Sequence, residues 1–160
     1  MKKLNKDNKG FSLVELLVVI AIMVVLVGVL APTLLGNIEK SRVSSDVQVL
    51  DSIAGAIQSA IGSDEKAYTD AMSIAGAEFT VDALYTGTVN SKDVSNLKTL
   101  MDEYLAKSKI AFKGTDAKTA YGTTANLLFK IETNGTISVR LTSDGTNTLT
   151  AKNVTYSVTR

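Results

Sequence analysis

The chain has 160 residues, which is enough for one domain of ordinary size and too few for two. Its formal net charge is +1 and 45% of its residues are hydrophobic, which excludes wholesale disorder and a strongly basic nucleic-acid-binding protein. The absence of cysteine and histidine excludes disulfides, thiolate metal sites and catalysis that uses histidine as the base. We therefore expect one compact unit with attached segments. Because the rest of the sequence shows no other catalytic site, we also expect no enzymatic activity, no cofactor and no metal.

The amino-terminal end is basic and precedes a long apolar run. Four lysines against one aspartate give the first ten residues a side-chain charge of +3, which by the positive-inside tendency keeps this end in the cytoplasm. The 23 residues 16–38 carry no charge, and as a helix they would span about 35 Å, more than a hydrocarbon core of about 30 Å. This pattern predicts one membrane-spanning helix with the rest of the chain outside the cytoplasm.

A cleaved secretory signal is the alternative interpretation of this segment. Residues 16–30 would be its apolar part, and Ala31 would be the small residue before the cut. However, Pro32 would directly follow that cut, where signal peptidase tolerates proline poorly, and Glu15 would lie at the edge of the apolar part. We therefore favour a helix that remains attached.

Glu15 needs an explanation, because a carboxylate at the centre of a membrane helix costs about 2.5 to 3.5 kcal/mol and less toward the interface. One interpretation is functional, with a cationic partner that neutralises the carboxylate. The other is that Glu15 marks the headgroup boundary and complements the positive amino end of a helix. Its position alone does not decide between the two.

Residues 9–16, with the sequence KGFSLVEL, carry a resemblance to a known family. They resemble the class III signal of type IV pilins and pseudopilins, which has a basic leader, a glycine before the cut and usually a phenylalanine after it. A glutamate at the fifth mature position and an apolar helix complete that signal, and this sequence has every one of these features. The resemblance covers the first 40 residues or so, and the rest of the chain carries no family motif.

The resemblance implies a processing step and an assembly step. A membrane prepilin peptidase would cut between Gly10 and Phe11 on the cytoplasmic side, and the new amine of Phe11 would be methylated. Residues 1–10 would then be a leader, residues 11–38 the transmembrane and filament-core helix, and residues 39–160 the extracellular head with the second half of the long helix. In a filament, the Glu15 carboxylate would meet the protonated Phe11 amine of a neighbouring subunit, which neutralises both charges and sets the register.

Pro32 lies inside the apolar run, where it removes one backbone hydrogen bond and is expected to kink the helix. Gly28, one turn earlier, adds flexibility. The resemblance implies that the stretch between such a glycine and proline can unwind in an assembled filament. A curved membrane helix with no further role is the alternative.

Beyond the membrane run, apolar or small residues recur at spacings of three and four and predict that the same helix continues to about residue 60. This stripe is expected to lie on the head, whereas Asp46 and Asp51 are placed off it. Its members are Val43, Val47, Leu50, Ala54, Ile57 and Ile61.

The middle of the head gives weaker signals. Residues 63–92 are interpreted as a connecting region of uncertain structure, with weak helical signals around residues 69–77. Residues 94–107 have helical spacing, and Ser91 or Asp93 could cap the start of that helix.

The sequence predicts mainly β-strands in the last part of the chain, from residue 126 onward. Residues 126–133 and 136–142 flank Asn134-Gly135, a strong hairpin signal because both residue types accept positive φ. Asp144-Gly145 predicts a further turn, and residues 154–159 predict another strand with Tyr156 on one face. We expect a three- or four-stranded antiparallel β-meander packed on the long helix, an α+β fold like that of pilins.

Other candidate sites are weak. Asp144, Gly145 and Asn147 could supply oxygen ligands to calcium, but this pattern is more typical of a plain turn. Basic residues of the head such as Lys107, Lys109 and Lys113 could form a weak basic patch, although we do not expect nucleic-acid binding. No Walker glycine loop is present, so we expect no bound nucleotide.

The leading hypothesis is a structural subunit of a type IV pilus filament, which assembles as an open helical homo-oligomer and supports adhesion, twitching motility or DNA uptake. A cytoplasmic ATPase would act through a membrane platform protein of the pilus machine. One alternative is a minor pilin or a pseudopilin of a type II secretion or competence system. Another is a membrane-anchored enzyme or binding protein that resembles a pilin by chance. The lack of cysteine is typical of pilins from Gram-positive bacteria.

Overall fold

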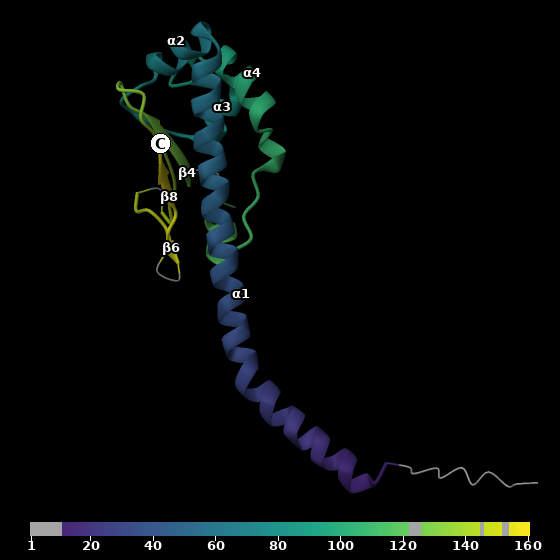
Figure 1. Ribbon diagram of the computed structural model, residues 1–160. Coiled ribbons are helices and arrows are strands. Elements are labelled where there is room, and N and C mark those ends of the chain that lie inside the picture. Colours follow the sequence, from purple (N-terminus) through teal and green to yellow (C-terminus); the bar gives the residue numbers. More distant parts are fainter. Residues whose placement is uncertain (1–10, 122–125, 145, 152–153) are drawn as a thin grey trace, which may run out of the picture. The chain divides into compact units, whose positions relative to one another are not determined.

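The computed structural model describes residues 11–121, 126–144, 146–151 and 154–160 (Figure 1). The chain divides into two units, Met1–Ile38 and Glu39–Arg160. Helix α1, which runs from Leu13 to Ser63, contributes residues to both units. The predicted continuation of the amino-terminal helix into the head is therefore confirmed, and the helix ends three residues beyond the expected position.

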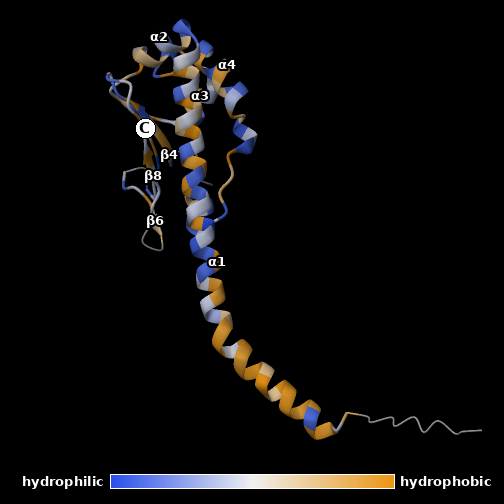
Figure 2. Cartoon of the chain, viewed as in Figure 1, coloured by the Kyte–Doolittle hydropathy of each residue, from blue (hydrophilic) through white to orange (hydrophobic). Residues whose placement is uncertain are grey.

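The amino-terminal unit consists of the first part of α1. Every residue from Leu13 to Leu35 is exposed. The helix is long and apolar enough to cross a membrane, with a mean hydropathy of 3.2 over its most apolar 18-residue window, and no residue of that window is buried. Figure 2 shows the hydrophobic colour along nearly all of this part of α1 and a mixture of hydrophilic and hydrophobic residues farther along the helix.

The second unit, called the head below, adds short helices and strands to the end of α1. Its helices are α2 (Glu65–Ser73), α3 (Val81–Thr86), α4 (Ser95–Tyr104), the 3-10 helix η1 (Lys107–Lys109) and α5 (Thr115–Tyr121). Its strands are β1 (Glu78–Thr80), β2 (Thr88–Val89), β3 (Lys92–Asp93), β4 (Leu127–Ile131), β5 (Ile137–Leu141), β6 (Thr150–Ala151), β7 (Val154–Thr155) and β8 (Ser157–Thr159).

A four-stranded antiparallel sheet has the strand order β1-β4-β5-β8. The predicted hairpin is confirmed, because β4 and β5 pair from Leu127 opposite Leu141 to Ile131 opposite Ile137. The expected small antiparallel sheet is also confirmed, but its four strands are not consecutive in the chain. Strand β1 reaches the sheet from the region before α3, and the two-stranded β6-β7 ribbon lies between β5 and β8 in the sequence. Periodicity did not reveal β1 because a three-residue strand is too short to show alternation.

The turn between β4 and β5 differs from the expected two-residue turn. The Glu132 N–H donates to the Thr136 carbonyl at 2.8 Å, and the Gly135 N–H donates to the Glu132 carbonyl at 2.9 Å. Only Gly135 has positive φ in this loop, at +86°, whereas Asn134 does not. The loop is therefore a three-residue turn with a left-handed glycine, which also fits the twist of antiparallel strands.

The carboxyl-terminal strand prediction is confirmed with one interruption. Residues 154–159 form β7 and β8, and Tyr156 lies between them with its side chain fully buried. The Leu141 N–H donates to the Tyr156 carbonyl at 3.0 Å, and the Tyr156 N–H donates to the Leu149 carbonyl at 2.9 Å. Tyr156 thus joins β5 to the segment that precedes β6.

The buried face of α1 joins one core with residues of the sheet and of helices α2 to α5. Of the predicted stripe, Val43, Leu50, Ala54 and Ile57 are buried, whereas the other two members are partly exposed. The placement of Asp46 off this stripe is wrong, because Asp46 is 0% exposed.

Asp46 is buried because backbone N–H groups satisfy its carboxylate. Its Oδ1 accepts the Lys113 N–H at 2.6 Å, and its Oδ2 accepts the Gly114 N–H at 2.7 Å. One residue farther along, the Thr115 N–H donates to Glu39 Oε1 at 2.9 Å. These two carboxylates of α1 and the backbone of residues 113–115 form what we call the carboxylate clamp, which holds the start of α5 against α1.

Helix α4 confirms the predicted second helix, with a start one residue later and an end three residues earlier than expected. Of the two predicted caps, Asp93 is used: its Oδ1 accepts the Ser95 N–H at 3.0 Å. Asp70 of α2 adds a second cap, because its Oδ2 accepts the N–H groups of Asn96 and Leu97 at 3.0 and 3.1 Å. The cap from Asp70 depends on packing between α2 and α4 and leaves no local sequence pattern.

The head is closed at Arg160 without a disulfide, since the chain has no cysteine. The Arg160 guanidinium donates to both carboxylate oxygens of Asp51 on α1, at 2.8 and 2.6 Å. The backbone of Arg160 also exchanges two hydrogen bonds with Ile137 of β5, at 2.7 and 2.8 Å. The guanidinium lowers the pKa of the Asp51 carboxyl by hydrogen bonding.

Candidate functional site

The start of α1 is fixed by two side chains of the predicted signal. The Ser12 N–H donates to Glu15 Oε2 at 2.9 Å, and the Val14 N–H donates to Ser12 Oγ at 3.3 Å. A serine before the first helical residue and a glutamate three positions later form a capping box, in which the two side chains satisfy N–H groups that have no partner within the helix. The capping role is one of the two interpretations of Glu15, and the structure supplies its geometry.

Phe11 lies before this box and outside the helix, with 87% of its surface exposed. Gly10, the predicted residue before the cut, lies outside the described residues. The nitrogen of Phe11 belongs to a peptide bond in the uncleaved chain, so it carries no charge for Glu15 to meet. The pairing of Phe11 with Glu15 of another subunit therefore stays a prediction.

Ser12 is the residue of this segment that the sequence reasoning did not single out. The signal that could have found it is the spacing Ser-x-x-Glu directly before an apolar run. Because the box fixes where the helix begins, it leaves Phe11 in non-helical backbone next to the predicted cut.

Gly28 and Pro32 both lie within α1, which remains helical through them. Proline has no N–H, so the Gly28 carbonyl, four residues earlier, lacks its usual helical donor. A Cβ added at Gly28 would meet nothing within 4 Å in the chain. The kink and the unwinding expected here stay predictions.

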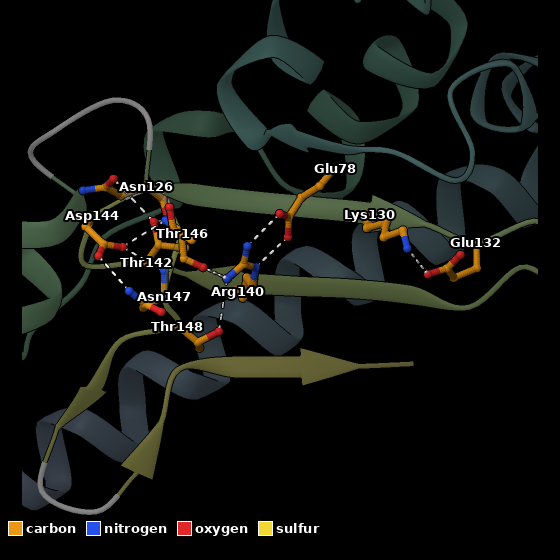
Figure 3. Close-up of polar contacts among 10 residues, drawn as sticks. All are labelled: Glu78, Asn126, Lys130, Glu132, Arg140, Thr142, Asp144, Thr146, Asn147 and Thr148. Carbon is orange, nitrogen blue, oxygen red and sulfur yellow. Dashed lines mark hydrogen bonds and ion pairs between the residues drawn. The ribbon is translucent and has the colours of Figure 1, made fainter.

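The predicted calcium alternative falls in the loop after β5, drawn in Figure 3. Asp144 Oδ1 accepts the N–H groups of Thr146 and Asn147 at 2.9 and 2.8 Å, and its Oδ2 accepts Asn147 Nδ2 at 2.8 Å. The backbone donor of Asn147 lowers the Asp144 pKa most, followed by that of Thr146, to about 2. These bonds account for an aspartate turn, while Gly145 lies outside the described residues.

Arg140 of β5, an inner strand, holds the same loop to the sheet (Figure 3). Its Nε and Nη2 donate to the two oxygens of Glu78 on β1, at 2.6 and 2.7 Å. Its Nη1 donates to the Thr146 carbonyl at 2.7 Å and to Thr148 Oγ1 at 3.3 Å. Arg140 therefore connects β1, β5 and the loop, and its hydrogen bonds lower the pKa of Glu78.

The two remaining candidates are a metal site and the predicted basic patch, and the described residues favour neither. No group of three or more aspartate, glutamate, histidine or cysteine side chains is placed to hold a metal ion there. Of the predicted basic patch, Lys107 pairs with Asp82 at 3.0 Å, and the Lys113 backbone belongs to the carboxylate clamp.

Comparison with known proteins agrees with the geometry at the start of α1. Residues 5–31 match the family model described as the prokaryotic N-terminal methylation motif. No curated protein and no solved structure matches the chain. The matched segment contains the predicted cleavage site, the capping box and most of the apolar run. The chain thus carries the class III signal of type IV pilins at its amino-terminal end, ahead of an α+β pilin-like fold.

Proposed function

We propose that this protein is a structural subunit of a type IV pilus filament, assembled from the membrane through α1. The observation that carries the proposal is the methylation motif at residues 5–31, which includes the start of the apolar helix α1, together with the exposure of every residue from Leu13 to Leu35 in this chain. An apolar surface of this length needs a covering environment. The membrane supplies it before assembly, and other copies of α1 supply it afterwards.

In this proposal, prepilin peptidase removes residues 1–10 and the amine of Phe11 is then methylated. Cleavage strips four lysines from the cytoplasmic side but leaves the apolar helix attached. The mature chain can therefore leave the bilayer without carrying that basic segment through it.

The new amine gives Glu15 a second partner. In the uncleaved chain the carboxylate accepts the Ser12 N–H at 2.9 Å. After cleavage, the protonated amine of Phe11 on a neighbouring subunit offers full charge compensation, which a peptide N–H does not. Because the pair forms at only one axial offset, it sets the register between neighbouring α1 helices.

The head would form the outer surface of the filament. A membrane platform protein and a cytoplasmic ATPase would supply the work of extraction. Adhesion, twitching motility or DNA uptake would then be properties of the filament.

A minor pilin or a pseudopilin of a secretion or competence system is the second candidate, because the same motif precedes the same kind of helix in those proteins. Abundance separates the two. A major pilin makes up nearly all of the mass of purified filaments, whereas a minor subunit is scarce in them.

Mass spectrometry of surface-sheared filaments tests the proposal. The expected result is a dominant species that begins with N-methylated Phe11. The variant Gly10→Val should retain residues 1–10, because a β-branched side chain at the scissile position obstructs an extended backbone in the peptidase cleft. Gly36→Val is the matched control and should be cleaved normally. A chain that starts at Met1 in sheared filaments would contradict the proposal.

A further inference from the structure

The hairpin tip between β4 and β5 presents an acceptor sequence that the filament proposal does not use. Asn134-Gly135-Thr136 has the pattern Asn-x-Thr, with a residue other than proline in the middle, which is the acceptor for N-linked glycosylation. Thr133, Asn134 and Gly135 are all exposed, and Thr136 is partly exposed. The pattern therefore lies on a surface loop, as attachment of a bulky saccharide requires.

The contacts of Asn134 leave its reactive atom available. Its Oδ1 accepts the Thr136 N–H at 2.9 Å, which brings the two residues of the acceptor sequence together. Over the described ranges, Nδ2 of Asn134 has no acceptor. Because N-glycosylation substitutes Nδ2 and leaves Oδ1 unchanged, the modification is compatible with this hydrogen bond.

The turn itself is held by backbone bonds that the modification does not touch. The Glu132 N–H donates to the Thr136 carbonyl at 2.8 Å, and the Gly135 N–H donates to the Glu132 carbonyl at 2.9 Å. The hairpin can therefore form before or after a saccharide is attached.

Glu132 distinguishes this site from the second Asn-x-Thr of the chain, Asn153-Val154-Thr155. The residue two positions before Asn134 is Glu132, whereas Ala151 stands at that offset from Asn153. The Glu132 carboxylate pairs with Lys130 Nζ at 2.6 Å, with side-chain exposures of 40% and 34% (Figure 3). An ion pair this exposed breaks at low cost, so the carboxylate is available to a basic side chain of a transferase.

We propose that Asn134 is an N-glycosylation site, modified on the outer face of the membrane by a transferase that uses a lipid-linked sugar phosphate. A bond forms between Asn134 Nδ2 and C1 of the sugar, while the bond between C1 and the phosphate oxygen breaks. Nδ2 loses one proton to a base of the transferase, the lipid phosphate leaves with the bonding electron pair, and nothing is oxidised or reduced. The inference rests on export of the head in the proposed function.

Peptide mapping and intact mass of the full chain, isolated from its own cells, test this inference. The expected result is a saccharide on the peptide that contains Asn134. Asn134→Gln and Thr136→Ala should both remove that mass, whereas Thr136→Ser, which keeps the hydroxyl, should retain it. Asn96→Gln is the matched control, because Asn96 is exposed but is followed two positions later by Lys98. Glu132→Gln should lower the glycosylated fraction at Asn134 several-fold.

Three results would overturn the inference: an unmodified Asn134, a deamidated Asn134, or a saccharide attached only to serine, threonine or Asn153. The same spectra report the amino terminus. N-methylated Phe11 together with a bare Asn134 contradicts the glycosylation site alone, whereas a chain that starts at Met1 contradicts the proposed function.

Discussion

Asp46 Oδ2 accepts the Gly114 N–H at 2.7 Å in the core of the head. Asp46 itself is 0% exposed. A Cβ at Gly114 would lie 2.7 Å from that same oxygen and 3.1 Å from the Tyr156 hydroxyl. Aspartate and glycine therefore depend on each other here. The carboxylate needs two backbone N–H groups to be buried, and the backbone can approach so closely only where residue 114 has no side chain.

Gly114→Ala is expected to destabilise the head by about 1 to 3 kcal/mol, because the new methyl group forces the carboxylate clamp apart. Denaturant unfolding of the full chain in detergent measures this change. Gly62→Ala is the matched control, since a Cβ at Gly62 meets nothing within 4 Å. An unchanged unfolding midpoint for Gly114→Ala would show that the carboxylate clamp accommodates a methyl group at residue 114 without losing its hydrogen bonds.

Tyr156→Phe and Tyr85→Phe form a second matched pair. The Tyr156 hydroxyl is buried, and it has no hydrogen-bond partner among the described residues. Burial raises its pKa to about 12, with the Asp46 carboxylate as the next cause. The hydroxyl of Tyr85, in contrast, donates to the Leu105 carbonyl at 2.5 Å.

Loss of the Tyr156 hydroxyl should therefore leave stability unchanged or raise it by up to about 1 kcal/mol, while loss of the Tyr85 hydroxyl should lower it by about 1 kcal/mol. Thermal unfolding of both variants gives the comparison. Equal destabilisation by the two substitutions would mean that Tyr156 has a polar partner in solution.

Arg140 is expected to contribute more to stability than Arg160, although both make bidentate ion pairs. Arg140 also donates to the Thr146 carbonyl and to Thr148, and its side chain is 24% exposed, against 40% for Arg160. Exposed ion pairs contribute about 0 to 1 kcal/mol, whereas hydrogen bonds to a charged group contribute about 1.5 to 3 kcal/mol. Arg140→Ala should therefore lower the free energy of unfolding more than Arg160→Ala does, as measured by denaturant unfolding. A larger loss for Arg160→Ala would contradict this expectation.

The head should lose stability in acid because several carboxyl groups have depressed pKa values. The pKa of Asp144 falls from 3.8 to about 2 through its backbone donors, so its contribution is complete above pH 3.8 and is lost as pH falls toward 2. The pKa values of Glu39, Asp51 and Glu78 are lowered as well, which adds to the same trend. Urea midpoints measured across this range should fall more gradually in Asp144→Asn than in the wild-type chain titrated in parallel. If the urea midpoints of the two chains had the same pH dependence, the Asp144 turn would make no contribution to the loss of stability in acid.

Long elements could be predicted from the sequence because their signals are repeated. The apolar run and the stripe that begins at Val43 give many consecutive residues the same helical preference, and α1 follows them to Ser63. The β4-β5 hairpin was equally accessible, because alternation on both sides of Asn134-Gly135 agrees with the turn residues.

Elements fixed by distant partners could not be predicted. Strand β1 depends on pairing with β4, more than 40 residues later, and the cap from Asp70 depends on α2 lying beside the start of α4. Asp46 was misplaced because a periodicity argument assigns every carboxylate to the solvent face. Only the backbone of residues 113–114 shows why this one is buried. At the amino-terminal site, the motif identified Phe11 and Glu15, and the capping box adds Ser12.

The two interpretations of Glu15 predict different effects for two substitutions. Glu15→Gln keeps a side chain that can cap the Ser12 N–H but removes the negative charge. Ser12→Ala removes the capping hydroxyl, which costs about 1 kcal/mol of helix stability, but keeps the charge. If Glu15 serves only the helix end, Glu15→Gln assembles normally; if it neutralises an amine, Glu15→Gln fails.

The yield of sheared filaments from Glu15→Gln cells, relative to total cleaved subunit in the membrane, tests the central claim most directly. We predict that the variant is cleaved but gives a filament yield at least about tenfold below wild type, because the Phe11 amine would then be buried without a compensating negative charge. Ser12→Ala should still form filaments. A wild-type yield from Glu15→Gln would contradict the charge pair between Glu15 and the Phe11 amine, and with it the proposed mode of assembly.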